Sequence, residues 1–196
     1  MRILGGSGEI HLFESSEWPS EGATRTGVDA FGEDKVILFS GTTLRLLDVE
    51  FELLGEATIE SGEPRAILYK DKVIWLAYEG FLLKSNEVFS LDNVTAWEQI
   101  SLPAGTSVSA FRHYKDGFVI LDGGANKKIH VLDKMATVLI SWDAPGSNVE
   151  KGDVMWTSPG FGFTVLMSMD GAGRRYHFLD DGIAALRGFF DDLLIN

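Results

Sequence analysis

The sequence predicts an all-β chain built from repeated four-stranded units, and three observations support that fold class. A short apolar run that ends in a polar residue recurs five times along the chain. Each copy follows a second apolar run, and turns containing glycine or small polar residues separate the two runs. Because glycine adopts the positive φ angles of tight turns without steric cost, such paired runs indicate β-hairpins.

The recurring run is clearest in residues 117–133, which read GFVILDGGANKKIHVLD. The five copies of its second half occupy residues 10–14, 44–48, 81–85, 129–133 and 176–180. The runs that precede them occupy residues 3–4, 36–39, 73–76, 118–121 and 163–167. We therefore expect five hairpins.

Two further runs flank most of the hairpins and complete a four-stranded unit. The expected lead-in strands are at residues 28–31, 65–69, 108–113 and 154–157, and the expected outer strands at 51–59, 97–102, 135–142 and 183–190. Four-stranded units that repeat about every 40 residues are typical of β-propellers, in which each sheet packs between two neighbours. We expect residues 1–196 to form a single β-propeller domain.

The two ends of the chain are expected to share one blade, which makes five blades in total. In this scheme residues 193–195 supply the lead-in strand of a sheet that also contains residues 1–5 and 9–14. The unit split between the ends is short, so four blades plus a partial one is the alternative. Residues 182–195 also fit a helical stripe. Gly188 disfavours a helix by about 1 kcal/mol, and a helix here would prevent this closure.

The charge and composition argue against several functional classes. A formal net charge of −12 creates a field that repels nucleic acid and anionic membrane surfaces. With no cysteine, the chain has no disulfide framework and no thiolate metal site. No stretch resembles a signal peptide or reaches the ~18 apolar residues of a membrane span. We therefore expect synthesis in the cytoplasm and no membrane insertion, while the final location stays open.

Residues 90–97, which read SLDNVTAW, resemble the Asp-box turn of sialidase-type propeller blades. Ser90, Asp92 and Trp97 match the box, whereas its glycine and threonine positions are occupied by Val94 and Ala96. In that family the box is a folding device, so the resemblance implies a propeller blade and not sialidase chemistry. The chain has no FRIP-like segment and is far shorter than a six-bladed sialidase.

Three acids near the expected lead-in strands could line the channel of the propeller: Asp29, Asp153 and Asp192. Two carboxylates at a suitable separation can act as acid and base on a glycosidic bond, which makes a glycosidase the least unlikely enzyme. Acids at strand ends are more often simply solvated, so we expect no catalytic residue.

Three of the four histidines, His11, His130 and His177, occupy the same position of the repeat. A repeated position predicts a structural role. Rotation about the axis of a propeller would hold these side chains apart, and a metal needs its ligands converged. We expect neither a metal site nor a cofactor.

Aromatic residues and one arginine are the candidate binding residues. Trp75, Tyr78, Arg112, Tyr114 and Trp156 lie near the ends of predicted strands, where they could stack on a sugar or anchor a protein loop. Packing between blades is the competing interpretation.

These observations predict a non-enzymatic interaction or structural module, an accessory component of a larger assembly such as a phage virion. Its partner would be a protein of that assembly or a glycan. A lectin-like sugar binder is the alternative, and it requires equivalent residues in the same loop of every repeat. The loops at residues 40–42, 79–80 and 123–126 share no such set.

Overall fold

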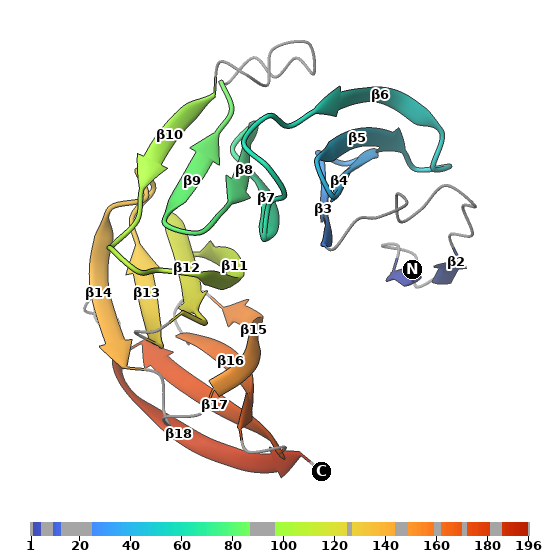
Figure 1. The fold of residues 1–196 in the computed structure, drawn as a ribbon. Helices are drawn as coiled ribbons and strands as arrows, with labels where there is room; N and C mark the ends of the chain where they lie inside the picture. Colours follow the sequence, from blue (N-terminus) through green and yellow to red (C-terminus); the bar gives the residue numbers. More distant parts are fainter. Residues whose placement is uncertain are drawn as a thin grey trace.

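A computed structural model gives the fold of the chain (Figure 1). It describes residues 25–86, 97–124 and 127–143, together with the strands at 2–4, 10–12, 149–158, 162–169, 172–180 and 186–195. Every helix or strand element assigned in these ranges is a β-strand, so the described residues contain no helix. The part of the chain so described contains no helix long and apolar enough to cross a membrane.

The described strands form four antiparallel sheets of four strands each and one sheet of two strands. Each large sheet is a meander of consecutive strands. The first sheet contains β3 (Thr26–Ala30), β4 (Lys35–Ser40), β5 (Thr43–Asp48) and β6 (Leu53–Thr58). The second contains β7 (Ala66–Lys70), β8 (Val73–Ala77), β9 (Phe81–Lys84) and β10 (Glu98–Ser101). The third contains β11 (Val108–Tyr114), β12 (Gly117–Asp122), β13 (Lys128–Leu132) and β14 (Val138–Asp143). The fourth contains β15 (Val149–Ser158), β16 (Gly162–Met169), β17 (Ala172–Asp180) and β18 (Leu186–Ile195). The small sheet pairs β1 (Arg2–Leu4) with β2 (Ile10–Leu12).

The four large sheets follow one another around an arc, with their first strands on the inner side (Figure 1). Consecutive first strands contact each other: β3 with β7, β7 with β11, and β11 with β15. The fourth strands, β6, β10, β14 and β18, lie on the outer side of the arc. This radial repetition of four-stranded meanders is the arrangement that the sequence repeat predicts.

The structure confirms the five predicted hairpins, and β18 shows that residues 186–195 form a strand and not a helix. The predicted closure is not found. Ile195 lies opposite Gly173 and Leu193 opposite Arg175, so this end of the chain pairs with β17. Among the described strands β1 pairs with β2 alone. Pairing β18 with the preceding strand closes a short loop, whereas pairing the two chain ends closes a much longer one.

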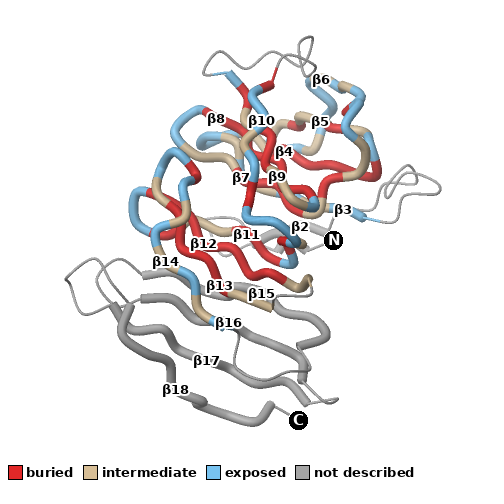
Figure 2. Tube along the Cα trace, turned by 60° about the vertical axis from the view of Figure 1, so that its left-hand side comes forward, coloured by how far each residue is buried: buried red, intermediate tan, exposed pale blue. Residues whose placement is uncertain are grey.

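Apolar clusters join each of the first three sheets to its neighbour, and β8 contributes to both of them. Val73, Trp75 and Ala77 belong to the cluster shared with the third sheet. Ile74 and Leu76 belong to the cluster shared with the first sheet. All five residues of β8 are therefore buried, as Figure 2 shows for the middle strands of the second sheet. A strand covered on both faces needs a continuous apolar run and not an alternating one.

The contact between Trp75 and Phe118 is central to the packing of the second sheet against the third. Their rings meet edge to face with centroids 4.7 Å apart, and both side chains are almost fully buried. Lys70 crosses the same boundary, because its Nζ donates to the carbonyl oxygens of Lys115 and Gly117 at 3.2 and 3.3 Å. Apolar packing and the hydrogen bonds of Lys70 thus join the same pair of sheets.

A buried polar cluster fixes the third sheet at the end of β12. Asp122 is fully buried, and its Oδ1 accepts the backbone N–H groups of Ser107 and Gly124, each at 2.7 Å. His130 Nδ1 lies 2.8 Å from Ser141 Oγ, and its Nε2 lies 3.9 Å from Asp122 Oδ2. Burial raises the pKa of Asp122, but the nearby imidazole and the two amide bonds outweigh it and hold that pKa below its usual value.

His130 thus has the structural role that was predicted for the repeated histidines. It is buried in the third sheet and joins β13 to β14 through Ser141. The side chains of His11 and His177 lie outside the described residues. His113 is bound elsewhere, with its Nε2 3.0 Å from the carbonyl oxygen of Tyr69 on the second sheet.

Replacing Phe118 by alanine should lower the free energy of unfolding by about 3–5 kcal/mol, because it leaves a cavity against Trp75. The matched control is Leu54→Ala on β6, where the side chain is 50% exposed and truncation should cost less than about 1 kcal/mol. Urea unfolding of both variants measures the difference. Equal losses would show that this contact does not hold the two sheets together.

Replacing Asp122 by asparagine should lower stability at pH 7 by about 1–3 kcal/mol, because a neutral amide binds the two N–H groups less strongly. The pKa of Asp122 is depressed in the folded protein, so its contribution is present above the unfolded value of about 3.9 and is lost as the pH falls below it. The wild-type protein should therefore lose stability more steeply than the variant below about pH 4. Parallel acid unfolding curves for the two proteins would contradict this assignment.

Candidate functional site

The structure buries three of the five candidate binding residues. Trp75, Tyr78 and Tyr114 are 3%, 4% and 4% exposed. Trp75 packs on Phe118, and Tyr78 stacks on Phe81 with ring centroids 4.6 Å apart. Large rings at strand ends fill the space between stacked sheets, which is the competing interpretation for these residues. Tyr114 and Trp75 also each line one of the hollows described below. Trp156 lies on β15 opposite Thr164, and its side chain is outside the described residues.

Arg112 and Asp29, by contrast, lie near each other on inner strands. Asp29 Oδ2 accepts the N–H of Tyr69 at 2.6 Å, and its Oδ1 accepts that of Ala30 at 2.9 Å. Burial raises the pKa of Asp29, although these two bonds and the nearby His113 and Arg112 oppose the rise. Asp29 therefore ties the first sheet to the second.

The three predicted channel acids do not all lie on inner strands. Asp153 is on the inner strand β15, opposite Leu166. Asp192 is on the outer strand β18, at a register shift between Asp191 and Leu193, which corrects its predicted place on a lead-in strand. Within the described ranges, moreover, His, Asp and Glu side chains nowhere gather in a group of three that could hold a metal ion.

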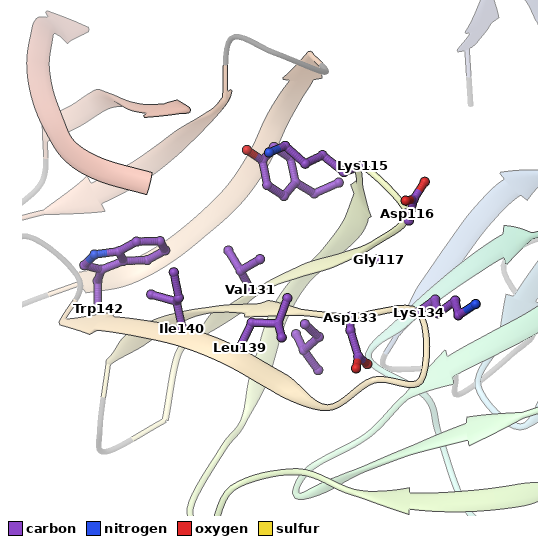
Figure 3. A pocket seen from close by; sticks show the side chains of 11 residues that line it. Lys115, Asp116, Gly117, Val131, Asp133, Lys134, Leu139, Ile140 and Trp142 are labelled. Atoms are coloured by element: carbon purple, nitrogen blue, oxygen red, sulfur yellow. The ribbon is translucent and has the colours of Figure 1, made fainter. Parts of the chain in front are cut away.

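A hollow that we call the third-sheet groove lies on the face of the third sheet turned away from the second and toward the fourth (Figure 3). Its volume is about 320 Å³. Its apolar lining includes Val131, Leu139, Ile140 and Trp142, and its charged lining includes Lys115, Asp116, Asp133 and Lys134. Figure 3 shows Val131, Ile140 and Trp142 turned toward the same space.

Leu139 is the most exposed large apolar side chain of the described residues, at 60%. Exposure alternates along β14, and Leu139 falls in the exposed phase with Ser141 and Asp143. It also lies at a β-bulge, because Val131 is opposite Ile140 and Leu132 is opposite Val138.

A second hollow, the Lys70 groove, runs between the second and third sheets. Its volume is about 250 Å³. Trp75 and Phe118 line its depth, and Met135, which is 55% exposed, lies at its border. It shares Asp116 and Lys134 with the third-sheet groove, so the two hollows flank the same turns of the third sheet. We call this combined area the turn surface.

A third hollow, the axial cavity, lies among the inner strands. Its volume is about 300 Å³, and its lining comes from β3, β7 and β11 with the residue that precedes β7. Arg65 and Arg112 both line it. Arg65 Nη2 lies 2.8 Å from Glu79 Oε2, and Arg112 Nη1 donates to the carbonyl oxygen of Phe111 at 2.9 Å.

The sequence analysis did not identify Leu139 or Met135. The alternation of apolar residues in the predicted outer strand could have identified Leu139. Val138, Ile140 and Trp142 fall on every second position, as in a half-buried strand, and Leu139 is an apolar residue between two of them. Residues 90–96 of the Asp-box-like segment lie outside the described residues, while Trp97 is buried between the first and second sheets.

Comparison with known proteins shows likeness at the level of structure. No protein-family model matches the chain, and no curated protein matches it significantly. The β-propeller domain of Cps50 (Swd1) from Myceliophteria thermophila is 11% identical with a TM-score of 0.57 over 87% of this chain and 60% of that one. BBS1N, solved in complex with ARL6DN, is 14% identical with a TM-score of 0.54 over 86% of this chain and 54% of that one.

A third similar structure is the computationally designed Ika4 protein, which is 20% identical with a TM-score of 0.51 over 81% of this chain and 93% of that one. The chain thus spans most of the designed protein but little more than half of BBS1N and of the Cps50 domain. At such identities the likeness bears on fold alone. This chain is an all-β protein whose four-stranded antiparallel sheets are arranged as in β-propeller domains.

Proposed function

We propose that the chain is a non-enzymatic protein-interaction module that docks its partner on the turn surface. The observation that carries this proposal is the exposure of two large apolar side chains, Leu139 and Met135, at the borders of two hollows that share Asp116 and Lys134. Exposed apolar groups beside hollows with a charged rim are typical of docking surfaces.

The partner would insert an apolar side chain into the third-sheet groove, against Val131, Ile140 and Trp142. Burial of such an anchor supplies most of the affinity at many interfaces. The lysines and aspartates at the rim would then set the orientation of the partner. The similar BBS1N fold, solved in complex with ARL6DN, gives a precedent for a protein partner.

The setting that we propose is a larger assembly, with a phage virion as the leading candidate. A rigid fold with a strongly acidic net charge suits a building block that must stay soluble until it docks. The glycan-binding alternative ranks second, because Trp75, Tyr78 and Tyr114 are each at most 4% exposed, and a sugar stacks on an exposed ring face.

Replacing Leu139 by aspartate should weaken partner binding by about tenfold or more, because a charge cannot enter the apolar groove without losing its hydration. The partner would be identified by affinity purification from the native source, and its binding to purified variants measured by calorimetry. The matched control is Leu54→Asp on β6, a leucine of similar exposure (50% against 60%) outside the turn surface, which should leave affinity unchanged. Equal affinities of the wild type and Leu139→Asp would place the interface elsewhere.

We also propose that the ring closes through a fifth blade that contains β1 and β2. In support, Leu38 and Leu47 lie on the face of the first sheet turned away from the second, yet they are only 1% and 4% exposed. That face is therefore covered. A neighbouring blade is the usual cover for a sheet in a radial repeat.

Closure can be tested by distance measurement, because the chain has no cysteine and two introduced ones would be its sole labelling sites. Spin labels at Ile3→Cys and Leu194→Cys should lie within about 25 Å of each other if β1 and β18 belong to adjacent blades, since stacked sheets are about 10 Å apart. A broad distribution at longer distances would indicate an open arc.

A further inference from the structure

The outer edge of the first sheet carries exposed apolar side chains. β6 lies on the outer side of the arc and, among the described strands, pairs with β5 alone (Figure 1). Six large apolar side chains are exposed in the described part of the chain, and three of them lie on β6 or in the turn before it: Val49, Leu53 and Leu54, at 51%, 56% and 50%. An open strand edge with exposed apolar groups is a template for a further strand.

Backbone groups at this edge point away from the sheet. The N–H of Ile59, just after β6, donates to the carbonyl oxygen of Thr42, just before β5, at 2.7 Å. The N–H and C=O groups of successive residues in an antiparallel strand point to opposite sides. Those of Glu56 and Thr58 therefore point to the open edge, where the described strands offer no partner. A strand laid beside β6 would meet both donors and acceptors there.

The features that often block an edge are largely missing from β6. Leu46 lies opposite Gly55 and Leu47 opposite Leu53, so a β-bulge falls at Leu54, at the turn end of the strand. From Gly55 to Thr58 the pairing with β5 is regular. β6 also contains no lysine and no proline, the residues that natural edge strands commonly use to prevent further pairing. This regular part of the edge can therefore accept another strand.

The same edge is uniformly acidic. Residues 46–64 contain six acids and no lysine, arginine or histidine. Four of these acids are exposed: Glu50, Glu52, Glu56 and Glu60. Of these four, Glu56 alone forms an ion pair in the described structure, with Arg45 at 2.7 Å. A second copy of the chain paired along β6 would bring its own glutamates against these, and like charges on facing strands are destabilising. The edge therefore favours a cationic occupant.

The two faces of β6 differ, which sets the residue pattern of that occupant. Ala57 packs against the cluster that the first and second sheets share. Its neighbour Glu56, opposite Arg45, lies on the other face. The side chains of an added strand would alternate in the same way. Its cationic residues would lie beside Glu56, and its apolar residues beside Ala57.

We propose that β6 docks an extended segment of a partner protein in which lysine or arginine alternates with apolar residues. The segment joins the first sheet as an additional strand. Its backbone pairs with Glu56 and Thr58, and its side chains provide the specificity. Leu53 and Leu54 supply apolar contact at the turn end of the edge. This edge is separate from the turn surface, and its test requires no partner protein, so either proposal can fail without the other.

The test is a calorimetric titration of the full chain with a capped synthetic peptide of alternating lysine and valine. The control peptide has the same composition with its lysines and valines in separate blocks, so it carries the same charge but cannot present two different faces. We expect saturable binding of one alternating peptide per chain. The block peptide should bind about tenfold more weakly, because it loses several cross-strand pairs.

Thr58→Pro tests the backbone pairing, because it removes the outward N–H without removing a hydrogen bond to β5. It should weaken binding of the alternating peptide by about fivefold or more, as loss of a hydrogen bond does. The matched control Thr58→Ala keeps the N–H and should change affinity by less than about twofold. If Thr58→Pro fails to fold in a thermal melt, Glu56→Gln replaces it, with binding expected to weaken about threefold at low salt.

Equal binding of the two peptides would overturn the assignment, because it would leave only attraction to an acidic surface. Equal affinities of Thr58→Pro and Thr58→Ala would do the same, as would an unchanged affinity of Glu56→Gln. A dimer in analytical ultracentrifugation that Thr58→Pro dissociates would also overturn it, because the edge would then be occupied by a second copy of the chain.

Discussion

The structure depends on one constraint: each internal sheet is apolar on both faces and needs a neighbour on each side. The five residues of β8 are all buried because Trp75 faces Phe118 of the third sheet while Ile74 and Leu76 face the first. Such a sheet standing alone would expose the apolar side chains of both faces to water. The contacts between neighbouring sheets therefore stabilise the fold. The outer faces of the first and last sheets also need a cover, and what covers them determines how many sheets the fold contains.

The same constraint explains how far the sequence predicts the fold. Hairpins are local, so paired apolar runs and glycine-containing turns identify them, including the β1–β2 pair near the start of the chain. Closure is not local. Residues 193–195 resemble a lead-in strand, yet they continue β18 along β17, where the partner strand is already adjacent. A short apolar run does not encode which of two available edges it will join.

The candidate site was predicted less well, because exposure depends on packing that the repeat does not specify. Trp75, Tyr78 and Tyr114 occupy strand ends in the sequence, but stacked sheets cover them. The exposed residues are instead an aliphatic one at a bulge, Leu139, and a turn methionine, Met135. Among the candidate residues of the sequence analysis, Arg112 lines the axial cavity, Tyr114 the third-sheet groove and Trp75 the Lys70 groove.

Close packing within a sheet also determines the character of the inner edge. Gly27 on β3 lies opposite Phe39, and a Cβ at Gly27 would lie 2.3 Å from the ring of that phenylalanine. The ring therefore requires glycine at this position of the inner strand. Ala66 and Ala110, which line the cavity with Gly27, are small as well. Small residues along the inner strands leave space at the axis. The middle strands β4, β8 and β12 instead carry long runs of large buried side chains, because each of them is covered by apolar side chains on both faces. Packing between sheets therefore places bulk on the middle strands and leaves the cavity among the inner ones.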